Sequence, residues 1–482
     1  MSPRKTNSLL YDKAHGPLNS FANRVNCAAM SEPLISTPTT AIEEKNLASA
    51  CDFCGRLRGS QDLTTPAGAE LKALVDANAP RKEPTAICAE CLELLKRAKA
   101  QVESHVAVFD QNDYVLPTPL RMDAHEAFTG RGVTIAFLDS GFYAHDDLTK
   151  PEDRIVAYHN IFSPDEDVTA LRTSDVASWH GMMTSVVAAG NGHLSEGFYR
   201  GIAPDAKVVL VKVGRTGRIP EKNIQLGLEW IIAHAEEFGI RVVNISAGGD
   251  FEQTYLENPL CQTVDRAVRA GLIVVCAVGN AGMAPGHPVL PPASSPAAIS
   301  VGGLDDQNSL DRAKRGMYRS SYGPTIDGLQ KPELIAPGIW VAAPILPSTP
   351  TADQAQLYSA LDAAADDELQ AIIECSPGID KDLDGARDLP VPLLRQLITI
   401  KLREGNVING NYKYVDGTSF ASPIVASIVA CMLEANPALT PQRVKRILID
   451  TAERVPAVEI ERQGWGVVVP RKAVEVALAM RA

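Results

Sequence analysis

Three side chains far apart in the sequence could together activate a nucleophile. Asp139 follows the apolar run Val133–Leu138, His180 opens a stretch of small and apolar residues, and Ser419 shortly precedes the apolar sequence IVASIVACML. Each alone has an ordinary explanation: a turn or cap for the aspartate, a structural role for the histidine and a helix N-cap for the serine. Together they support acyl transfer, because an imidazole held by a carboxylate can take the proton of an attacking hydroxyl.

The serine lies in the octapeptide DGTSFASP, which ends at Pro423. Gly417 permits a tight turn, Ser419 is expected at the start of a helix, and Pro423 is expected in the first turn of that helix. Backbone N–H groups at a helix start lack intrahelical partners, so an oxyanion beside Ser419 would be stabilised there. His180 is also expected at a helix start, where a lowered proton affinity would suit a general base near neutral pH.

The elements that must position these groups alternate between strands and helices from about residue 112 onward. Short runs rich in Val and Ile are flanked by Gly, Asp or Asn and separated by helical stretches. The predicted strands are Val133–Leu138, Lys207–Val213, Arg241–Ile245 and Leu272–Val278, and the predicted helices include Glu221–Phe238 and Leu260–Ala270. This pattern predicts an α/β fold, a mostly parallel sheet with helices on both faces. In such sheets the functional loops lie beyond the carboxyl ends of the strands.

With these segments in the order Asp, His, Ser, the chain resembles the subtilisin-like (S8) serine proteases over roughly residues 112–482. The resemblance implies that Asp139 orients, that His180 acts as base and then acid, and that Ser419 attacks the scissile carbonyl. The segment VVCAVGN resembles the one that supplies the oxyanion-hole asparagine, which implies that role for Asn280. Further matching segments are GIAPDA at 201–206, SSYGP at 320–324, APG at 336–338 and GWG at 464–466.

The resemblance also implies a substrate-binding edge. The segment NISAGG at 244–249 resembles the family's edge on which an extended peptide pairs in β-strand fashion. The predicted substrate-binding residues are Ser246, Ala247, Gly248, Ala277, Val278 and Gly279, and they suggest an apolar, permissive primary pocket. In one departure from the family pattern, Met182 and Met183 replace the commoner Thr-His after His-Gly. In another, no stretch resembles the usual folding-assistant propeptide.

Four of the nine cysteines are clustered as Cys51/Cys54 and Cys88/Cys91, a CxxC…CxxC set with 33 residues between the pairs. Two such knuckles can surround one structural Zn²⁺ tetrahedrally, and the metal would supply folding free energy to a small unit. The alternative is four unrelated thiols. The sequence CDFCG…ICAECLELL resembles the zinc-binding domain of ClpX-type unfoldases. This resemblance implies that the unit docks a protein partner or associates with a second copy. No ATPase motif of the form GxxxxGK[ST] accompanies it.

The chain is predicted to have three regions: a mobile tail at 1–45, a four-cysteine zinc-finger docking domain at 46–105, and a peptidase domain at 112–482. An insertion at about 346–410 interrupts the last. It contains the sequence AQLYSALDAAADDELQAIIEC at 355–375, a predicted helix, and a second helical stretch around Leu393–Leu402. Because the insertion enters between the APG segment and Ser419, we expect it near the cleft, in a position to gate it.

Composition narrows the function further. The 482 residues exceed the ~250–300 at which one core usually stops growing. A net charge of −12 argues against binding nucleic acid or an anionic membrane, and no apolar run approaches the ~20 residues of a membrane span. The first thirty residues carry no uninterrupted apolar segment typical of a signal peptide. We therefore expect a cytoplasmic protein with a protein or peptide substrate.

The leading hypothesis is an intracellular serine endopeptidase that works through an acyl-enzyme, with the zinc finger docking a partner or substrate. One alternative is a catalytically silent binding protein on the same scaffold. Another is a latent protease that is switched on by a partner or by movement of the insertion. The complete set of Asp139, His180, Asn280 and Ser419 favours an enzyme. Structural calcium, frequent in the resembled family, stays open because no liganding carboxylates are assigned.

Overall fold

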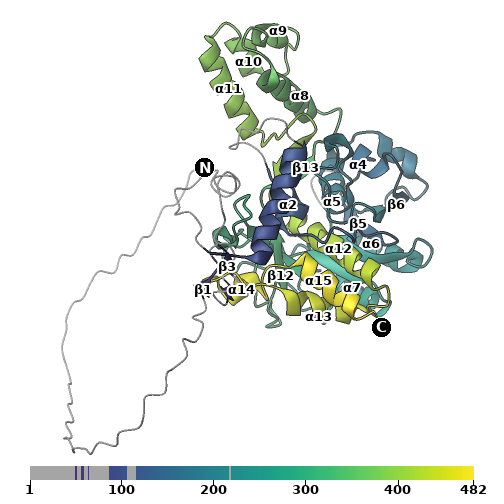
Figure 1. Cartoon of the computed structure of the whole chain (residues 1–482). Coiled ribbons are helices and arrows are strands. Elements are labelled where there is room, and N and C mark those ends of the chain that lie inside the picture. Colours follow the sequence, from purple (N-terminus) through teal and green to yellow (C-terminus); the bar gives the residue numbers. More distant parts are fainter. Residues whose placement is uncertain are drawn as a thin grey trace, which may run out of the picture. The chain divides into compact units, whose positions relative to one another are not determined.

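The structure is a computed structural model that describes residues 49–51, 56–58, 63–64, 86–105, 115–215 and 219–481 (Figure 1). The predicted tail at 1–45 and the cysteine Cys54 lie outside the described residues. The described residues before the main body form two short antiparallel strand pairs and a helix. These elements are β1 (Ser49–Ala50) with β2 (Leu57–Arg58), β3 (Leu63–Thr64) with β4 (Ile87–Cys88), and α2 (Ala89–His105).

The main body is built on a sheet with the strand order β11-β10-β9-β8-β5-β7-β6, with β12 paired to β10. Its strands are β5 (Thr134–Asp139), β6 (Ile155–Asn160), β7 (Lys207–Lys212), β8 (Ile240–Ile245), β9 (Ile273–Ala277), β10 (Ile299–Asp305), β11 (Gly316–Met317) and β12 (Leu334–Pro337). All pairings are parallel except β10 with β11. The prediction of a mostly parallel sheet is confirmed, and the four predicted strands end within one residue of β5, β7, β8 and β9.

Helices cover both faces of the sheet. Along β5, Ile135 and Phe137 belong to the core shared with α5 and α12, whereas Ala136 and Leu138 belong to the core shared with α6 and α7. A strand buried on both faces must be apolar at successive positions, which is why these strands appear in the sequence as short Val/Ile runs. One layer contains α5 (Trp179–Ala189), α12 (Thr418–Ala435), α13 (Pro441–Thr451) and α15 (Pro470–Ala479), and the other contains α6 (Glu221–His234) and α7 (Pro259–Arg269).

Shorter helical segments lie in the connecting loops. They are the α-helices α3 (Thr118–Arg121), α4 (Asp146–Thr149) and α14 (Ile460–Gln463) and the 3₁₀ turns η2 (Val168–Arg172), η3 (Val176–Ser178), η4 (His193–Ser195) and η5 (Arg312–Lys314). Among the described residues, the helix α12 alone is long and apolar enough to cross a membrane by length and composition. However, 89% of it is buried inside the fold, as expected for a central core helix.

The expected insertion is a separate group of helices between the strands β13 (Val341–Pro344) and β14 (Tyr412–Val415), which pair antiparallel. Its helices are α8 (Pro350–Ala363), α9 (Leu369–Glu374), α10 (Lys381–Ala386) and α11 (Val391–Glu404), which lie together in Figure 1. They share a small apolar core that includes Leu361, Leu369 and Leu394. The helix predicted at 355–375 is wrong as one element, because the chain becomes extended at Ala364 and divides it into α8 and α9.

The order of the strands in the sheet indicates where a binding site is expected. The strands β7 and β6, which follow β5 in the sequence, lie on one side of β5 in the sheet. The next strands, β8 and β9, lie on the other side of β5, so the direction of the strand order reverses there. In open parallel sheets the crevice beyond the carboxyl ends of strands at such a reversal is the usual binding position. The carboxyl ends of β5 and β8 are Asp139 and Ile245, one residue before Ser246.

Candidate active site

Asp139 and His180 are brought into direct contact. Asp139 ends β5 and is almost fully buried, so rigid backbone holds its carboxylate. His180 lies in the first turn of α5, and its Nδ1 atom is 2.8 Å from Asp139 Oδ2 and 3.0 Å from Oδ1. The backbone N–H of Ser140 donates to Asp139 Oδ1 at 2.7 Å, and Thr184 Oγ1 lies 3.5 Å from Oδ2. The carboxylate is thus oriented from three sides.

A glycine makes this contact feasible. Gly181 follows the histidine, and a Cβ atom on it would lie 2.2 Å from the carbonyl oxygen of Gly141 and 2.8 Å from Cβ of Asp139. Any side chain at Gly181 would therefore push the first turn of α5 away from β5. The imidazole face is bordered by the ring of Trp179 at 5.2 Å and the ring of Phe420 at 5.7 Å between centroids.

The pKa of His180 is higher than its ordinary value, whereas the sequence predicted a lower one. Burial alone lowers the pKa of His180, but the negative charge of Asp139 and its hydrogen bond outweigh burial, so the pKa is raised. The expected lowering by the helix start is therefore wrong, because the carboxylate is in direct contact with the ring. The side chain keeps 21% of its surface exposed, and no hydrogen bond among the described residues involves its Nε2 atom.

Ser419 stands at the start of α12, as expected. Gly417, with φ of +136°, precedes the helix, and its N–H donates to the carbonyl of Gly338 in the APG segment at 2.7 Å. The Ser419 hydroxyl donates to the carbonyl of Ser246 at 3.4 Å. Within the described part of the chain it makes no hydrogen bond to His180. The structure therefore joins the aspartate to the histidine and leaves the serine hydroxyl turned toward the end of β8.

Pro423 is not in the first turn of α12, contrary to expectation. The helix already begins at Thr418, so the proline lies inside it and cannot donate to the carbonyl of Ser419 four residues earlier. Ser246 Oγ donates to that carbonyl instead, at 2.8 Å. The amide of Asn244 donates to Ser246 Oγ at 3.0 Å and accepts from Ser422 Oγ at 2.7 Å. These bonds tie the end of β8 to the first turns of α12.

Asn280 is held with its amide in a defined orientation. The backbone N–H of Thr418 donates to Asn280 Oδ1 at 2.9 Å, and Thr418 Oγ1 donates to the same oxygen at 3.0 Å. Thr418 Oγ1 in turn accepts from the N–H of Gly279 at 3.2 Å. Since Oδ1 is occupied by donors, the NH₂ group of Asn280 is left as the outward donor. Thr418 was missed by sequence reasoning, although its place immediately before Ser419 was the available signal.

A pocket of about 270 Å³ adjoins Ser419. All six predicted substrate-binding residues line it, together with Asn280 and Ser419. The additional lining residues are Ala281, Pro288, Leu290, Ser321 and Thr418. No charged side chain lines the pocket among the described residues, so its walls favour small or apolar groups. Sequence reasoning missed Pro288 and Leu290 because they lie in a loop without a recognisable motif.

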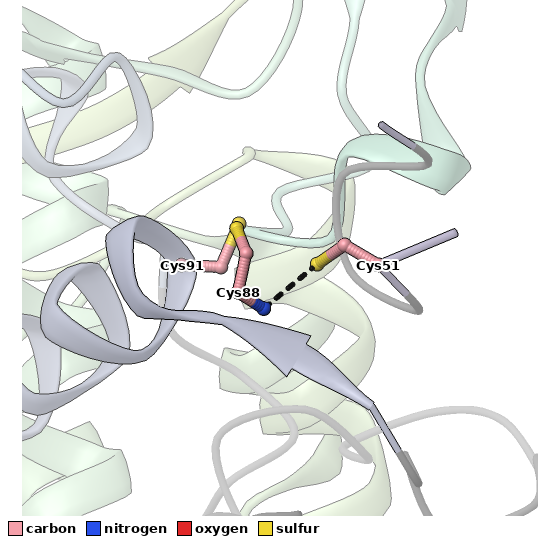
Figure 2. A group of neighbouring side chains, drawn as sticks. All are labelled: Cys51, Cys88 and Cys91. Atoms are coloured by element: carbon pink, nitrogen blue, oxygen red, sulfur yellow. Dashed lines mark hydrogen bonds between the residues drawn. The ribbon is translucent and has the colours of Figure 1, made fainter. Parts of the chain in front are cut away.

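A second group of reactive side chains lies apart from this pocket. The sulfur atoms of Cys51, Cys88 and Cys91 lie within 4.8 Å of one another and are buried (Figure 2). The N–H of Cys88 donates to Cys51 Sγ at 3.3 Å, the dashed line in Figure 2. Tetrahedral zinc with Zn–S bonds of ~2.3 Å needs sulfurs about 3.8 Å apart, so this soft donor set fits Zn²⁺. The fourth predicted ligand, Cys54, lies outside the described residues.

Parts of this chain are similar in sequence to known proteins. Serine protease AprX of Bacillus subtilis (strain 168) is 31% identical over 337 residues, which are 67% of this chain and 62% of AprX. The chain thus spans less than two thirds of AprX. Subtilisin BL of Lederbergia lenta is 31% identical over 217 residues, which are 45% of this chain and 67% of that protein.

The fold is also found among solved structures. The structure of the Clostridium perfringens CspB protease matches with a TM-score of 0.54 at 15% identity, over 76% of this chain and 97% of that one. The model of the subtilase family, peptidase S8, matches residues 130–466. That span contains the contacting Asp139 and His180, the turn before Ser419 and the pocket that Ser419 lines. This chain belongs to the subtilase family.

Proposed function

We propose that this chain is a serine endopeptidase that hydrolyses peptide bonds in proteins or peptides through an acyl-enzyme. One combination of observations supports it above the others: His180 contacts Asp139 at 2.8 Å, its ring lies 5.7 Å from the ring of Phe420, and the preceding residue, Ser419, lies at a helix start and lines an uncharged pocket. The likeness to AprX and to subtilisin BL supports the same reaction class. The roles given below to each residue are part of the proposal.

Substrate binding uses the end of β8. An extended peptide pairs with the backbone at Ser246–Gly248, and one of its side chains enters the pocket beside Ser419. The apolar, uncharged lining accepts small and apolar side chains more readily than charged ones, because an unpaired charge would lose its hydration there.

In acylation the Ser419 hydroxyl leaves the Ser246 carbonyl, to which it donates at 3.4 Å, and donates to His180 Nε2 instead. The ring takes the hydroxyl proton as the oxygen attacks the scissile carbonyl carbon. The resulting oxyanion accepts from the NH₂ of Asn280 and from the N–H of Ser419, which lies in the first helical turn and has no intrahelical partner. Asp139 stabilises the imidazolium, His180 passes its proton to the leaving amine, and water then hydrolyses the acyl-enzyme by the same steps.

The test is substitution of the nucleophile. We expect Ser419→Ala to abolish labelling by a fluorophosphonate probe and to lower kcat for a peptide substrate by about 10⁶. Ser427→Ala is the matched control, because Ser427 is a buried serine of the same helix whose hydroxyl bonds only the carbonyl of Ile424 among the described residues. Equal cleavage by Ser419→Ala and the unmodified protein would overturn the proposal.

A latent protease is the second candidate, because the Ser419 hydroxyl donates to the carbonyl of Ser246 rather than to His180. In that case the folded chain reacts slowly with the fluorophosphonate probe until a substrate or partner turns the hydroxyl. A catalytically silent protein would show no labelling under any condition. The labelling rate with and without a bound peptide therefore separates the three hypotheses.

The cysteine cluster supports a structural metal site. Cys51, Cys88 and Cys91 would hold Zn²⁺ with Cys54 as the fourth ligand, and the unit would dock a protein partner or substrate or associate with a second copy. Because these ligands must stay reduced, we place the protein in the cytoplasm, which cell fractionation tests. We expect about one zinc per chain by elemental analysis. We also expect loss of zinc in Cys88→Ser but not in Cys375→Ser, whose cysteine is exposed and remote.

A further inference from the structure

A carboxylate lies at the end of the backbone Ser246–Gly248, on which the substrate of the proposed reaction pairs. Glu221 is the first residue of α6, and a Cβ atom added at Gly249 would overlap its Oε2 atom. Gly249 directly follows Gly248, and its N–H donates to the carbonyl of Pro291 at 2.6 Å. One carboxylate oxygen of Glu221 is therefore packed against the residue at which the pairing edge ends.

The Glu221 side chain is held in this position by a hydrogen bond. The amide of Asn258 donates to Glu221 Oε1 at 2.5 Å. Asn258 is fully buried and caps α7, because its Oδ1 atom accepts from the N–H of Cys261 at 2.9 Å. The start of α7 thus fixes the carboxylate at the start of α6.

The second carboxylate oxygen is left for an external donor. Among the described residues, Glu221 Oε2 accepts no hydrogen bond and Glu221 takes part in no ion pair. The residue is half-buried, but Oε2 is not among the fully buried polar atoms of the described chain that lack a partner, so it contacts solvent. A partly buried carboxylate has lost part of its hydration, and an approaching cation therefore stabilises it more than a fully exposed one.

The register of an extended substrate places one particular residue beside Glu221. The Ser419 hydroxyl donates to the carbonyl of Ser246, so the residue whose carbonyl Ser419 attacks lies against Ser246. In antiparallel pairing each peptide residue faces one residue of the edge, and successive residues advance by about 3.4 Å. Gly249 lies three positions after Ser246. It therefore faces the peptide residue three positions before the attacked one, which is the fourth residue before the scissile bond.

We infer that Glu221 is a specificity-determining residue that selects a basic side chain at the fourth residue before the scissile bond. The inference rests on the proposed function and deepens it. No charged side chain lines the pocket beside Ser419 among the described residues, so Glu221 adds a charged contact to an uncharged edge. Arginine and lysine can lay their apolar stems along this edge and bring their charged ends to Oε2, whereas a glutamate there is repelled.

The test compares three peptides that differ only at this fourth residue, which is arginine, glutamine or glutamate. With the unmodified protein we expect kcat/KM to be about fivefold higher for arginine than for glutamine, and lower again for glutamate. High ionic strength should reduce these differences, because salt screens a pair that contacts solvent. We expect Glu221→Gln to bring the three values together.

The matched control is Glu229→Gln, because Glu229 lies on the same helix and its carboxylate pairs with Arg266. This variant should keep the preference for arginine. A fall in kcat/KM by the same factor for all three peptides in Glu221→Gln would show a structural role instead and would overturn the inference.

Binding is measured separately, so that the two proposals can fail separately. The Kd of each peptide is determined by fluorescence anisotropy with Ser419→Ala and with Ser419→Ala combined with Glu221→Gln. Cleavage of the three peptides at equal rates would overturn the inference and leave the peptidase standing. No cleavage by the unmodified protein, with tighter binding of the arginine peptide that Glu221→Gln removes, would overturn the peptidase and leave the recognition by Glu221 standing. Neither cleavage nor binding would overturn both.

Discussion

His180 owes its proton affinity to two opposing effects. Burial favours the neutral ring, and the charge and hydrogen bond of Asp139 favour the imidazolium and prevail, so the pKa of His180 is raised. A general base must be neutral to accept the Ser419 proton. Activity is therefore expected to rise as the pH increases through this raised pKa, and to be lost at lower pH.

The substitution Asp139→Asn removes the negative charge beside His180, while the His180 ring stays buried. We expect the pKa of His180 to fall below its usual value, so that the acid limb of kcat/KM moves to lower pH. We also expect kcat to fall by about 10⁴, because the ring loses its preferred tautomer. The measurement is kcat/KM against pH, with the exposed Asp165→Asn as control. An acid limb that does not move would contradict the assigned cause.

The amide of Asn280 and its support by Thr418 can be tested separately. Asn280→Ala removes the donor, and we expect kcat to fall by about 10²–10³ with little change in KM. Thr418→Val keeps the shape but removes the hydroxyl that bonds Asn280 Oδ1, so we expect a smaller fall in kcat. Steady-state kinetics of both variants gives the comparison. A change confined to KM would place Asn280 in ground-state binding instead.

Gly181 is required by close packing. Gly181→Ala would place a Cβ atom 2.2 Å from the carbonyl of Gly141, so we expect a loss of unfolding free energy of about 1–3 kcal/mol and a weakened contact between His180 and Asp139. Gly385→Ala in α10 is the control, since nothing lies within 4 Å of its Cβ position. Denaturant unfolding compares the two. Equal stability of both variants would show that α5 can shift freely.

At the scale of elements, the hairpin β13–β14 links the inserted helices to both halves of the site. Strand β14 leads through Gly417 to Ser419, and near the end of β13 the carbonyl of Pro347 accepts from Ser174 Oγ at 2.6 Å, six residues before His180. Tyr412, at the start of β14, donates to the buried Asp147 at 2.7 Å. The hairpin thus connects the inserted helices to the segments that contain His180 and Ser419, and the gating role expected for these helices stays a prediction.

Tyr412→Phe tests this connection. It removes the hydroxyl from a buried carboxylate, so we expect a loss of about 1–3 kcal/mol in unfolding free energy. Tyr414→Phe in the same strand is the matched control, because the Tyr414 hydroxyl has no hydrogen-bond partner within the described part of the chain. Denaturant unfolding measures both. If Tyr412→Phe were as stable as the control, the bond to Asp147 would not anchor the hairpin.

At the scale of the whole molecule, the site and the cysteine cluster are distinct. The pocket beside Ser419 contains no residue before Ser246, whereas the cluster is covered by Leu116, Phe198 and Leu310. Chelation of zinc from the full chain is therefore expected to lower Tm while leaving KM for a short peptide unchanged. Thermal unfolding and steady-state kinetics on the same sample check this. A large rise in KM would instead make the cluster part of the substrate site.

The sequence by itself identified the groups to which we assign catalysis, and it determined the central strands. Asp139, His180 and Ser419 lie in short motifs, and β5, β7, β8 and β9 are runs that must be apolar because both faces are buried. Such signals are local, since each depends on residues within one element. The strands β6, β10 and β12 were not predicted, because they are short or contain polar residues and glycine.

Only the tertiary structure decided which groups meet. Three contacts join segments more than 130 residues apart. The Ser419 hydroxyl donates to the carbonyl of Ser246, and Thr418 donates to Asn280. Ser246 in turn donates to the carbonyl of Ser419, which Pro423 leaves without a helical donor. The carboxylate of Glu453 joins the two ends of the chain in the same way, through an ion pair with each. Contacts of this kind leave no periodicity in the sequence, because packing of one element on another, rather than local propensity, brings their partners together.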